Sequence, residues 1–430
     1  MVNTLAGRLG RAINARPGEV RPAISGFALM FCLFSGYFML RPIRESMGIQ
    51  GGVNNLQWLF SATFVVMLIA VPLFAWLNSR VPRAHFVDWV FALFAGNLLL
   101  FALAFALLGD STWLARVFYV WISVYNLFVV SVAWSLLADV FDGQQAKRMF
   151  AFIAAGASVG GLLGPAASAL LVAYLDASGL TLIAALLLLA ALFCKRFLMR
   201  WRALGGAGRP AAPVTQPPSQ PVPGNPFSGI TQVLASPYLI AVCGFVLLLA
   251  TVSTFLYFEQ ARLVAQLFPE REAQVRVFGL IDVIVQAGAL FTQLFISGRV
   301  AQALGVRMLL ASVPLLVCVG FLGLALMPTF GMLAAVMIVR RVGEYAFLRP
   351  GREMIFAPLD AQTKYKAKNF IDTVVYRGGD ALSGWAKSFL DLLGQGTLLV
   401  ALVGAGCAAL WGGLGWYLGR RDDREAGPRE

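Results

Sequence analysis

Residues 237–258 read PYLIAVCGFVLLLATVSTFLYF and contain no charged side chain. A helix needs about 20 apolar residues to cross the hydrocarbon core of a bilayer. Similar runs recur along a chain that is 59% hydrophobic and only 13% charged, a composition too apolar for a water-exposed surface. A lipid-facing backbone must satisfy its own polar groups, and the runs lack the alternation of barrel strands. The sequence therefore predicts an all-α, polytopic membrane protein.

The apolar runs predict about twelve membrane-spanning helices, each bounded by charged residues, proline or glycine. These spans are residues 23–40, 56–77, 86–108, 116–140, 149–174, 179–199, 237–258, 277–297, 307–327, 330–348, 369–393 and 397–418.

A stretch rich in Pro, Gly and Ala separates the sixth and seventh predicted spans, with the sequence PAAPVTQPPSQPVPGNP at its centre. Such a composition cannot bury enough apolar surface to fold and predicts a linker. The expected organisation is an N-terminal segment (1–22), a six-helix half (23–199), the linker (200–236), a second six-helix half (237–418) and a tail (419–430). Two six-helix halves are typical of major-facilitator transporters, which bind substrate between their halves near the membrane midplane.

The distribution of Lys and Arg predicts the orientation of the chain. With the N-terminus in the cytoplasm, most of the 34 basic residues fall on the cytoplasmic side, in agreement with the positive-inside rule. The first 22 residues carry four arginines but no small-residue cleavage site, which indicates a retained first span. We expect a multi-pass protein of the cell inner membrane with both termini cytoplasmic.

An internal repeat links the ends of the first and tenth predicted spans. Residues 37–45 and 345–353 share the pattern Tyr-x-x-Leu-Arg-Pro-x-Arg-Glu. In a scheme of three-helix repeats the two spans are equivalent, and the motif would close a cavity at opposite membrane faces. The alternative is that each Arg-Pro pair only ends a helix while the arginine extends toward lipid headgroups.

Charged side chains within the spans are the best candidates for a binding site, because a charge at bilayer depth normally faces a partner or a water-filled path. The eleventh span places Asp372, Tyr376 and Asp380 on one helical face. Arg377 could bind a solute or simply pair with Asp380, and the lysines before this span could collect anions or act as membrane anchors. The expected binding residues are Arg41, Arg44, Glu45, Asp282, Arg352, Glu353, Lys366, Lys368, Asp372, Tyr376, Arg377 and Asp380.

Other functional classes lack the residues that they need. No GxxxxGK[ST] phosphate-binding loop is present, so ATP hydrolysis is not expected to drive transport. The single histidine, His85, has no neighbouring metal ligands, and the five cysteines lie in apolar runs without a CxxC pair. The basic residues that give the net charge of +13 follow the membrane topology, so nucleic acid is not an expected partner. We expect no enzymatic activity, cofactor or metal; the partners are the bilayer and a small anionic solute, and a monomer is plausible.

The stretch EYAFLRPGREMIFAPLDAQTKYKAKNFIDTVVYRGGDALSGW, residues 344–385, resembles the nucleotide-translocase family of plastids and intracellular bacteria. The resemblance rests on Tyr345, Pro350, Arg352-Glu353-Met354, Pro358-Leu359, Lys366, Lys368 and Asp372, and on MLRPIRES at residues 39–46. Members of that family exchange ATP for ADP. Arg349 and Pro42 stand where the family has Asp, so the resemblance implies a divergent relative that keeps a route for an anion lined by arginine and lysine.

Three functions are compatible with these features. The leading hypothesis is secondary active transport of a small anionic metabolite, such as a nucleotide or another phosphorylated compound, by alternating access and in an exchange mode. The second is a proton-coupled major-facilitator exporter of amphipathic or cationic compounds, favoured by the aromatic content and by Gly156-x-x-x-Gly160-x-x-x-Gly164-Pro165 in the fifth span. Those glycines more simply predict close helix packing. The third is a membrane protein that binds lipid or a partner without transport.

Overall fold

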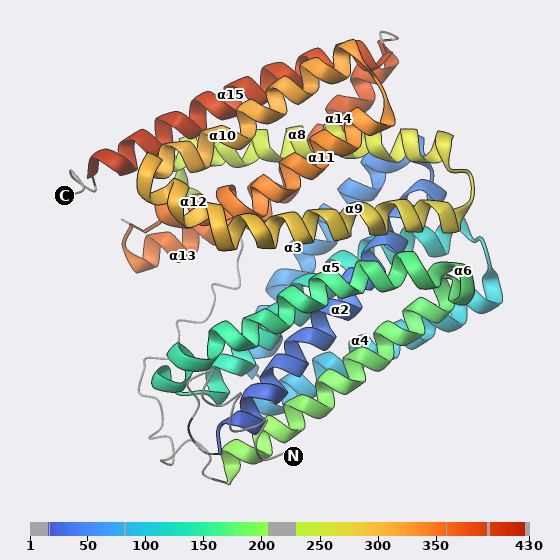
Figure 1. Cartoon of the computed structure of the whole chain (residues 1–430), viewed down its shortest axis with the longest axis vertical. Coiled ribbons are helices and arrows are strands. Elements are labelled where there is room, and N and C mark those ends of the chain that lie inside the picture. The colour runs from blue at the N-terminus through green and yellow to red at the C-terminus, as the bar shows by residue number, and fades with distance from the viewer. Residues whose placement is uncertain are drawn as a thin grey trace. The chain divides into compact units, whose positions relative to one another are not determined.

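The computed structural model describes residues 16, 18–80, 83–204, 229–357, 359–393 and 396–425. Within these ranges the secondary structure is helical and includes no strand, which confirms the all-α prediction (Figure 1). Most of the predicted linker at 200–236, and most of the N-terminal segment at 1–22, lie outside the described residues.

The chain divides into two compact units. Unit 1 consists of Met1–Met47, Trp76–Pro221 and Arg271–Val283, and unit 2 consists of Gly48–Ala75, Val222–Glu270 and Ile284–Glu430. These units are not the two six-helix halves expected from the sequence, because each includes one segment from the other predicted half. The halves themselves stay a prediction.

Unit 1 contains four long helices and the first half of a fifth. They are α2 (Val20–Gln50), α4 (Arg83–Leu108), α5 (Thr112–Val140), α6 (Gly143–Ala203) and the beginning of α9 (Arg271–Thr292). Helix α6 begins at a capping box, in which Asp142 accepts a hydrogen bond from the Gln145 amide and its own amide donates to the Gln145 side chain. Figure 1 shows α4 running alongside α6.

The glycines of α6 allow its backbone to touch that of α2. A Cβ atom added at Gly156 would lie 2.3 Å from the Phe27 carbonyl oxygen, and one added at Gly160 would lie 2.6 Å from that of Phe31. No side chain larger than hydrogen fits at these distances. The expected packing role of the glycine motif in the fifth span is therefore confirmed.

Unit 2 holds the remaining helices, several of which are interrupted by short 3₁₀ or π turns. In chain order they are η1 (Val53–Asn55), α3 (Leu56–Arg80, which enters unit 1 at Trp76), α7 (Ile230–Leu234), α8 (Pro237–Leu267), the end of α9, η2 (Gln293–Ser297), α10 (Gly298–Leu326), α11 (Phe330–Gly343), η3 (Glu344–Leu348), α12 (Arg349–Ile355), α13 (Ala361–Phe370), η4 (Ile371–Val375), α14 (Tyr376–Leu392) and α15 (Gly396–Glu425). Helix α15 lies along α10, and α8 packs against α14 and α15 (Figure 1).

Two predicted helix ends are wrong. The sequence predicts that the first span ends at residue 40, yet α2 continues through Pro42 to Gln50. Pro42 donates no backbone hydrogen bond, yet the helix continues for two further turns beyond it. The predicted spans leave residues 349–368 as a connection between the tenth and eleventh spans, but this region forms α12 and α13. Lys366 and Lys368 therefore lie on a helix that leads directly into the eleventh span.

Most of the helical segments are long and apolar enough to cross a membrane. Eight such segments occur in the described residues, and two of them, Gly143–Ala203 and Arg271–Leu326, each contain two predicted spans. A single residue interrupts the helical dihedrals in each: Asp176, with φ of 50°, and Gly305, with φ of 80°. The predicted tenth and eleventh spans are not among these eight segments, and both carry several charged side chains.

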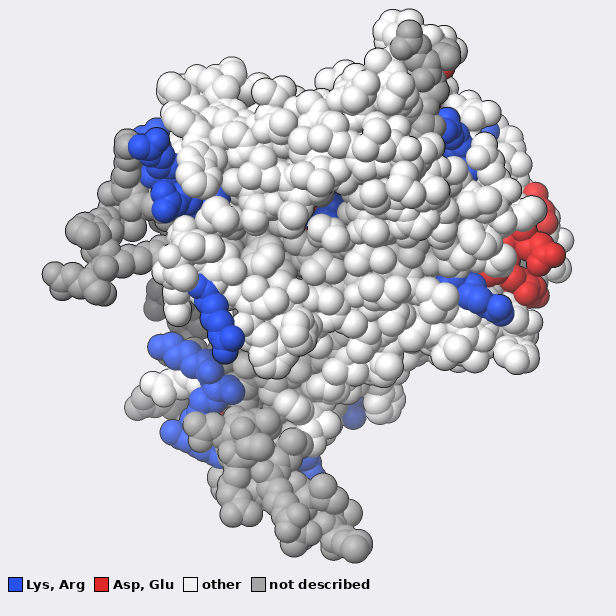
Figure 2. Space-filling model, turned by 45° about the horizontal axis from the view of Figure 1, so that its top comes forward, with Lys and Arg blue, Asp and Glu red and all other residues white. Residues whose placement is uncertain are grey.

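The surface of the described helices suits a lipid environment. Large apolar side chains are exposed along the long helices, as at Trp89 (74%) and Phe193 (76%). Figure 2 shows a face that is mostly uncharged, with Lys and Arg side chains gathered mainly toward its margins. The chain is a multi-pass membrane protein.

Candidate functional site

The copy of the repeat motif in α2 forms an ion-pair network within unit 1. Arg41 Nε lies 3.7 Å from Asp282 Oδ2 of α9 and 4.0 Å from Glu45 Oε1, and Arg44 Nη1 lies 3.0 Å from the same Glu45 oxygen. The four residues that the sequence predicts on these two helices are thus brought together. Both carboxylates are buried.

Neighbouring contacts extend this α2–α9 network, which we define as Arg41, Arg44, Glu45 and Asp282. The Arg44 guanidinium carbon lies 4.1 Å from the centre of the Tyr119 ring, a cation–π contact with α5. Directly after the motif, the Ser46 hydroxyl donates to Gln274 Oε1 of α9 at 3.1 Å. Two cations face two anions, so the network is electrically balanced.

The predicted residues at the other copy of the motif lie in unit 2. Arg352 Nη2 of α12 is 3.1 Å from Asp372 Oδ1 of η4, and Lys368 of α13 forms an ion pair with Glu353. These four residues form two neutral pairs that join α12 to the helix leading into α14. Lys366 lies half-buried on α13, where its carbonyl group closely approaches Gly229.

Elsewhere in unit 2, a cluster of charged residues is centred on Glu344 at the beginning of η3. Arg340 Nη1 lies 2.9 Å from Glu344 Oε2 and donates a 2.7 Å hydrogen bond to the Ser253 hydroxyl of α8. Arg349 Nη2 lies 3.6 Å from the other Glu344 oxygen, and the charge of Arg341 also acts on this carboxylate. One acid is therefore shared by three arginines.

The predicted residues of α14 belong to the same cluster. Asp380 Oδ2 is 3.5 Å from Arg377 Nη1, and its other oxygen accepts a 3.4 Å hydrogen bond from Thr254 of α8. Tyr376, half-buried, lies within electrostatic reach of Glu344 as well as Asp380, so it connects the two acids. The pairing of Arg377 with Asp380, one of the two alternatives expected from the sequence, is present.

We call this assembly the central cluster: Arg340, Arg341, Glu344, Arg349, Tyr376, Arg377 and Asp380. Its members comprise four guanidinium groups and two carboxylates, so the cluster as defined carries an excess of two positive charges. The Arg349 side chain is 60% exposed and that of Arg377 is 32% exposed, whereas Arg340 and Arg341 are buried. Charge at bilayer depth is costly and marks a candidate binding position.

Two π-helical turns, η3 and η4, shape the central cluster. A π turn widens the helix by one residue, and such turns are frequent at functional sites. The extra residue in η4 changes the direction in which the side chains after it point. Asp372 pairs with Arg352 of α12, whereas Asp380 accepts a hydrogen bond from α8. The polar face predicted for the eleventh span is accordingly divided between two neighbouring helices.

The sequence-based site does not include Arg340, Arg341 or Glu344. All three lie in the predicted tenth span, where the two adjacent arginines are visible as charges within an apolar run. The sequence does not reveal that the two arginines are buried: Arg340 is 7% exposed and Arg341 is 6% exposed. In the described residues no group of His, Cys, Asp and Glu is arranged to hold a metal ion.

A multi-pass membrane protein whose helices hold clusters of buried and partly exposed charged side chains has the features of a solute transporter. A family model of the Major Facilitator Superfamily matches residues 26–268. The chain belongs to this superfamily, whose members are secondary active transporters, and it is a transporter of this class.

Solved structures of transporters share the fold across nearly the whole chain. A bacterial homologue of the human lysosomal transporter Spinster, in an inward-facing and unoccupied conformation, is 13% identical with a TM-score of 0.61 and covers 95% of this chain and 99% of its own. An auto-inhibited peptide transporter of the POT family is 14% identical (TM-score 0.64; 93% and 97% covered), and the nucleoside transporter NupG is 14% identical (TM-score 0.60; 94% and 99% covered). No curated protein gives a significant match to the chain.

Proposed function

We propose that this transporter carries a small anionic metabolite bearing a phosphate group and binds it at the central cluster of unit 2. The observation that supports the proposal is the excess of two positive charges in the central cluster, of which Arg340 and Arg341 are buried. A phosphate monoester carries close to two negative charges at neutral pH and would compensate this excess. A cationic substrate would add to it, so the charge balance disfavours export of cations.

The chemistry of the open groups also suits phosphate. Guanidinium groups donate two parallel hydrogen bonds to a phosphate, which a lysine ammonium cannot reproduce. Arg349 and Arg377 are the more exposed arginines of the cluster and are the proposed direct contacts. Arg340 and Arg341, which are buried, would supply charge and hold Glu344 in place.

The other predicted binding residues take supporting roles in this proposal. Lys366, Lys368 and Arg352 lie on the approach from the proposed cytoplasmic side and would attract the anion, while Glu353 and Asp372 hold two of these cations in position. The neutral α2–α9 network would act in the conformational cycle. The resemblance to nucleotide translocases supports an exchange mode, and the positive-inside pattern supports an inner-membrane protein with both termini in the cytoplasm.

The proposal is tested by the melting temperature of the purified protein in detergent with inorganic phosphate, glucose 6-phosphate, AMP, ADP and, as a cation, tetraphenylphosphonium. A ligand that binds only the folded state raises the melting temperature as its occupancy rises. We expect a rise with at least one phosphorylated compound, a loss of that rise in Arg349→Gln, and an unchanged rise in the control Arg116→Gln. Stabilisation by tetraphenylphosphonium alone, or equal shifts in both variants, would contradict the proposal.

A further inference from the structure

Half-buried aromatic side chains lie beside the central cluster in unit 2. The Phe64 ring of α3 lies 3.4 Å from the position that a Cβ atom would take at Gly378 of α14, one residue after Arg377. One turn earlier on α3, the Phe60 ring is centred 5.5 Å from the ring of Tyr257 on α8. We call Phe60, Phe64 and Tyr257 the aromatic wall, and all three are half-buried.

Helix α8 joins the aromatic wall to the charged groups. Ser253, which accepts a hydrogen bond from Arg340, lies one turn before Tyr257, so the two side chains share a helical face. Thr254, the next residue along α8, donates to Asp380. One turn of an α-helix rises about 5.4 Å. The aromatic wall therefore begins about one helical turn from groups that belong to the central cluster or bond to it.

Gly378 leaves the backbone of α14 uncovered at the aromatic wall. A Cβ atom at this position would meet the Phe64 ring at ordinary van der Waals distance, whereas one at Gly160 would lie 2.6 Å from a backbone oxygen. Packing against the described residues therefore does not require a glycine at position 378. A glycine that packing does not require leaves room for a ligand to approach the backbone closely. The backbone at Gly378 and the neighbouring rings together offer an apolar surface next to Arg377.

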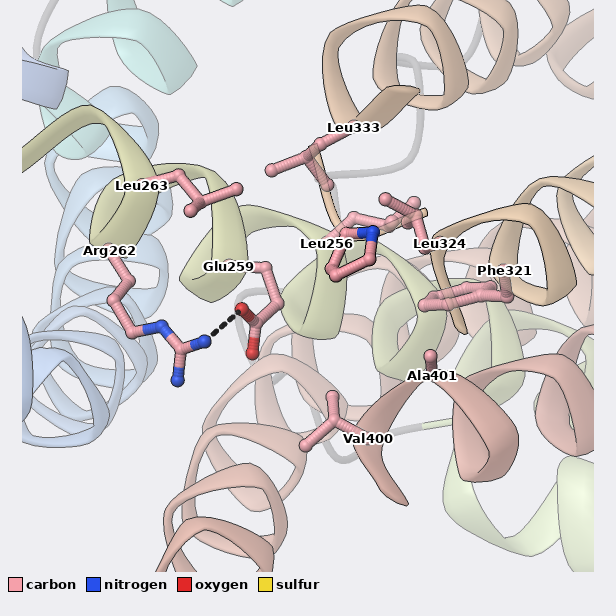
Figure 3. A pocket seen from close by; sticks show the side chains of 10 residues that line it. Leu256, Glu259, Arg262, Leu263, Phe321, Leu324, Leu333, Val400 and Ala401 are labelled. Atoms are coloured by element: carbon pink, nitrogen blue, oxygen red, sulfur yellow. Dashed lines mark ion pairs between the residues drawn. The ribbon is translucent and has the colours of Figure 1, made fainter. Parts of the chain in front are cut away.

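The pocket shown in Figure 3 lies further along α8 and suits an anion less well. Its charged lining residues are Glu259 and Arg262, which pair at 3.2 Å beside apolar side chains such as Phe321. Lys387 Nζ lies 2.9 Å from Glu259 Oε1 and 2.6 Å from Asp391 Oδ1, so two cations face two carboxylates. This group is electrically balanced, whereas the central cluster carries a positive excess. Of the two charged groups along α8, the central cluster is therefore the one that suits a phosphate.

We propose that the solute is an aryl phosphate, an ester in which an aromatic ring is joined to the phosphate group, an inference that rests on the proposed function. The phosphate binds the exposed guanidinium groups of Arg349 and Arg377. The ring packs against the aromatic wall, because offset-stacked and edge-to-face contacts between aromatic rings are favourable. The short ester linkage suits a separation of about one helical turn between the two parts of the site. The aromatic wall selects the ring, and the central cluster selects the charge.

The affinities for phenyl phosphate and glycerol 3-phosphate test this inference, because both are phosphate monoesters of similar charge and only the first carries a ring. The melting temperature of the purified full-length protein is titrated against each compound. We expect the wild type to bind phenyl phosphate about tenfold more tightly, the scale of a favourable aromatic contact. Phe64→Leu should remove most of this preference and leave the affinity for glycerol 3-phosphate unchanged. The control Phe389→Leu, whose side chain is 62% exposed on α14, should keep the preference.

Gly378→Ala is a second variant that keeps every aromatic side chain. An alanine fits at this helical position without a clash, so the variant should fold normally. Its methyl group covers the backbone that the ring would contact, and we expect the preference for phenyl phosphate to fall. A preference that is unchanged in both Phe64→Leu and Gly378→Ala would overturn the role of the aromatic wall.

The same titrations separate this inference from the proposed function. Equal affinities of the wild type for the two esters, both lost in Arg349→Gln, would overturn the preference for an aryl group and leave the phosphate site in place. Binding of glucose 6-phosphate or ADP but of neither ester would do the same. Binding of no phosphorylated compound would overturn both the inference and the proposed function.

Discussion

At the scale of single residues, the two charged clusters near the repeat motif differ in their electrical balance. In the α2–α9 network each arginine has a carboxylate partner, whereas the arginines of the central cluster outnumber its acids. Corresponding residues of the motif thus perform different tasks: Arg41 pairs across to Asp282, while its counterpart Arg349 stacks on Tyr345 at 4.4 Å and remains exposed. Substitutions of Arg41 and of Arg349 are therefore expected to have different effects.

We predict that Arg349→Lys weakens binding of the phosphorylated ligand about tenfold although the charge is unchanged, because the ammonium group lacks the planar fork of guanidinium. Titrating the melting temperature against ligand concentration gives the apparent affinity. The side chain is exposed, so the variant should fold normally. Unchanged affinity in Arg349→Lys would contradict a bidentate contact between Arg349 and the phosphate group.

At the scale of helices, hydropathy predicts where the spans are but not where they end. The two kinks at Asp176 and Gly305 fall between predicted spans, and the glycine spacing of α6 correctly indicates close packing. The predicted ends are wrong at Pro42 and at residues 349–368, because helical structure continues through positions where a proline or a run of charged residues was expected to end a span. The π turns that shape the central cluster carry no signal in the sequence, so the grouping of Glu344 with Tyr376 could not be predicted.

The contact between α2 and α6 provides a stability prediction. Gly160→Ala places a methyl group 2.6 Å from a backbone oxygen, and we expect a loss of about 1–3 kcal/mol from overpacking. Gly96→Ala, in a helix of the same unit with open space around the Cβ position, should be neutral or stabilising by up to ~1 kcal/mol. The melting temperatures of the two variants in detergent measure this difference. Equal shifts would argue against the close contact between the backbones of α2 and α6.

Two π turns of unit 2 are held together by side chains. Gln293 and Ser297 of η2 donate to the carbonyl oxygens of Tyr345 and Ala346 in η3, at 3.0 and 2.7 Å. We predict that Ser297→Ala destabilises unit 2 by about 1 kcal/mol, because an acceptor loses its partner. Ser388→Ala, which removes only a bond within one helix turn, is the control. If the two variants melt alike, the connection between η2 and η3 contributes nothing measurable.

At the scale of the whole molecule, alternating access requires contacts between the predicted halves that form and break during transport. We expect Ser46 of α2 and Gln274 of α9 to be such a contact, since their side chains meet at 3.1 Å and their helices belong to different predicted halves. By contrast, Ser178 donates to the carbonyl oxygen of Ala102 at 2.7 Å, and both residues belong to the first half. The two pairs therefore distinguish motion between halves from motion within one.

We predict that cross-linking the pair Ser46→Cys and Gln274→Cys with a short thiol-reactive linker that can be cleaved by reduction, in a background without the five native cysteines, abolishes exchange and that reduction restores it. The same treatment of Ala102→Cys with Ser178→Cys should leave most of the exchange activity. Full activity of the first pair after verified cross-linking would contradict motion between α2 and α9.

Solute exchange in liposomes tests whether the positive excess of the central cluster binds a phosphorylated anion. Vesicles containing the purified protein and preloaded with unlabelled phosphate, glucose 6-phosphate, AMP or ADP are supplied with the same compound in radiolabelled form. We predict saturable exchange of at least one of these compounds that falls at least tenfold in Arg349→Gln and persists in Arg116→Gln. Exchange of none of them by protein that transports tetraphenylphosphonium would contradict it.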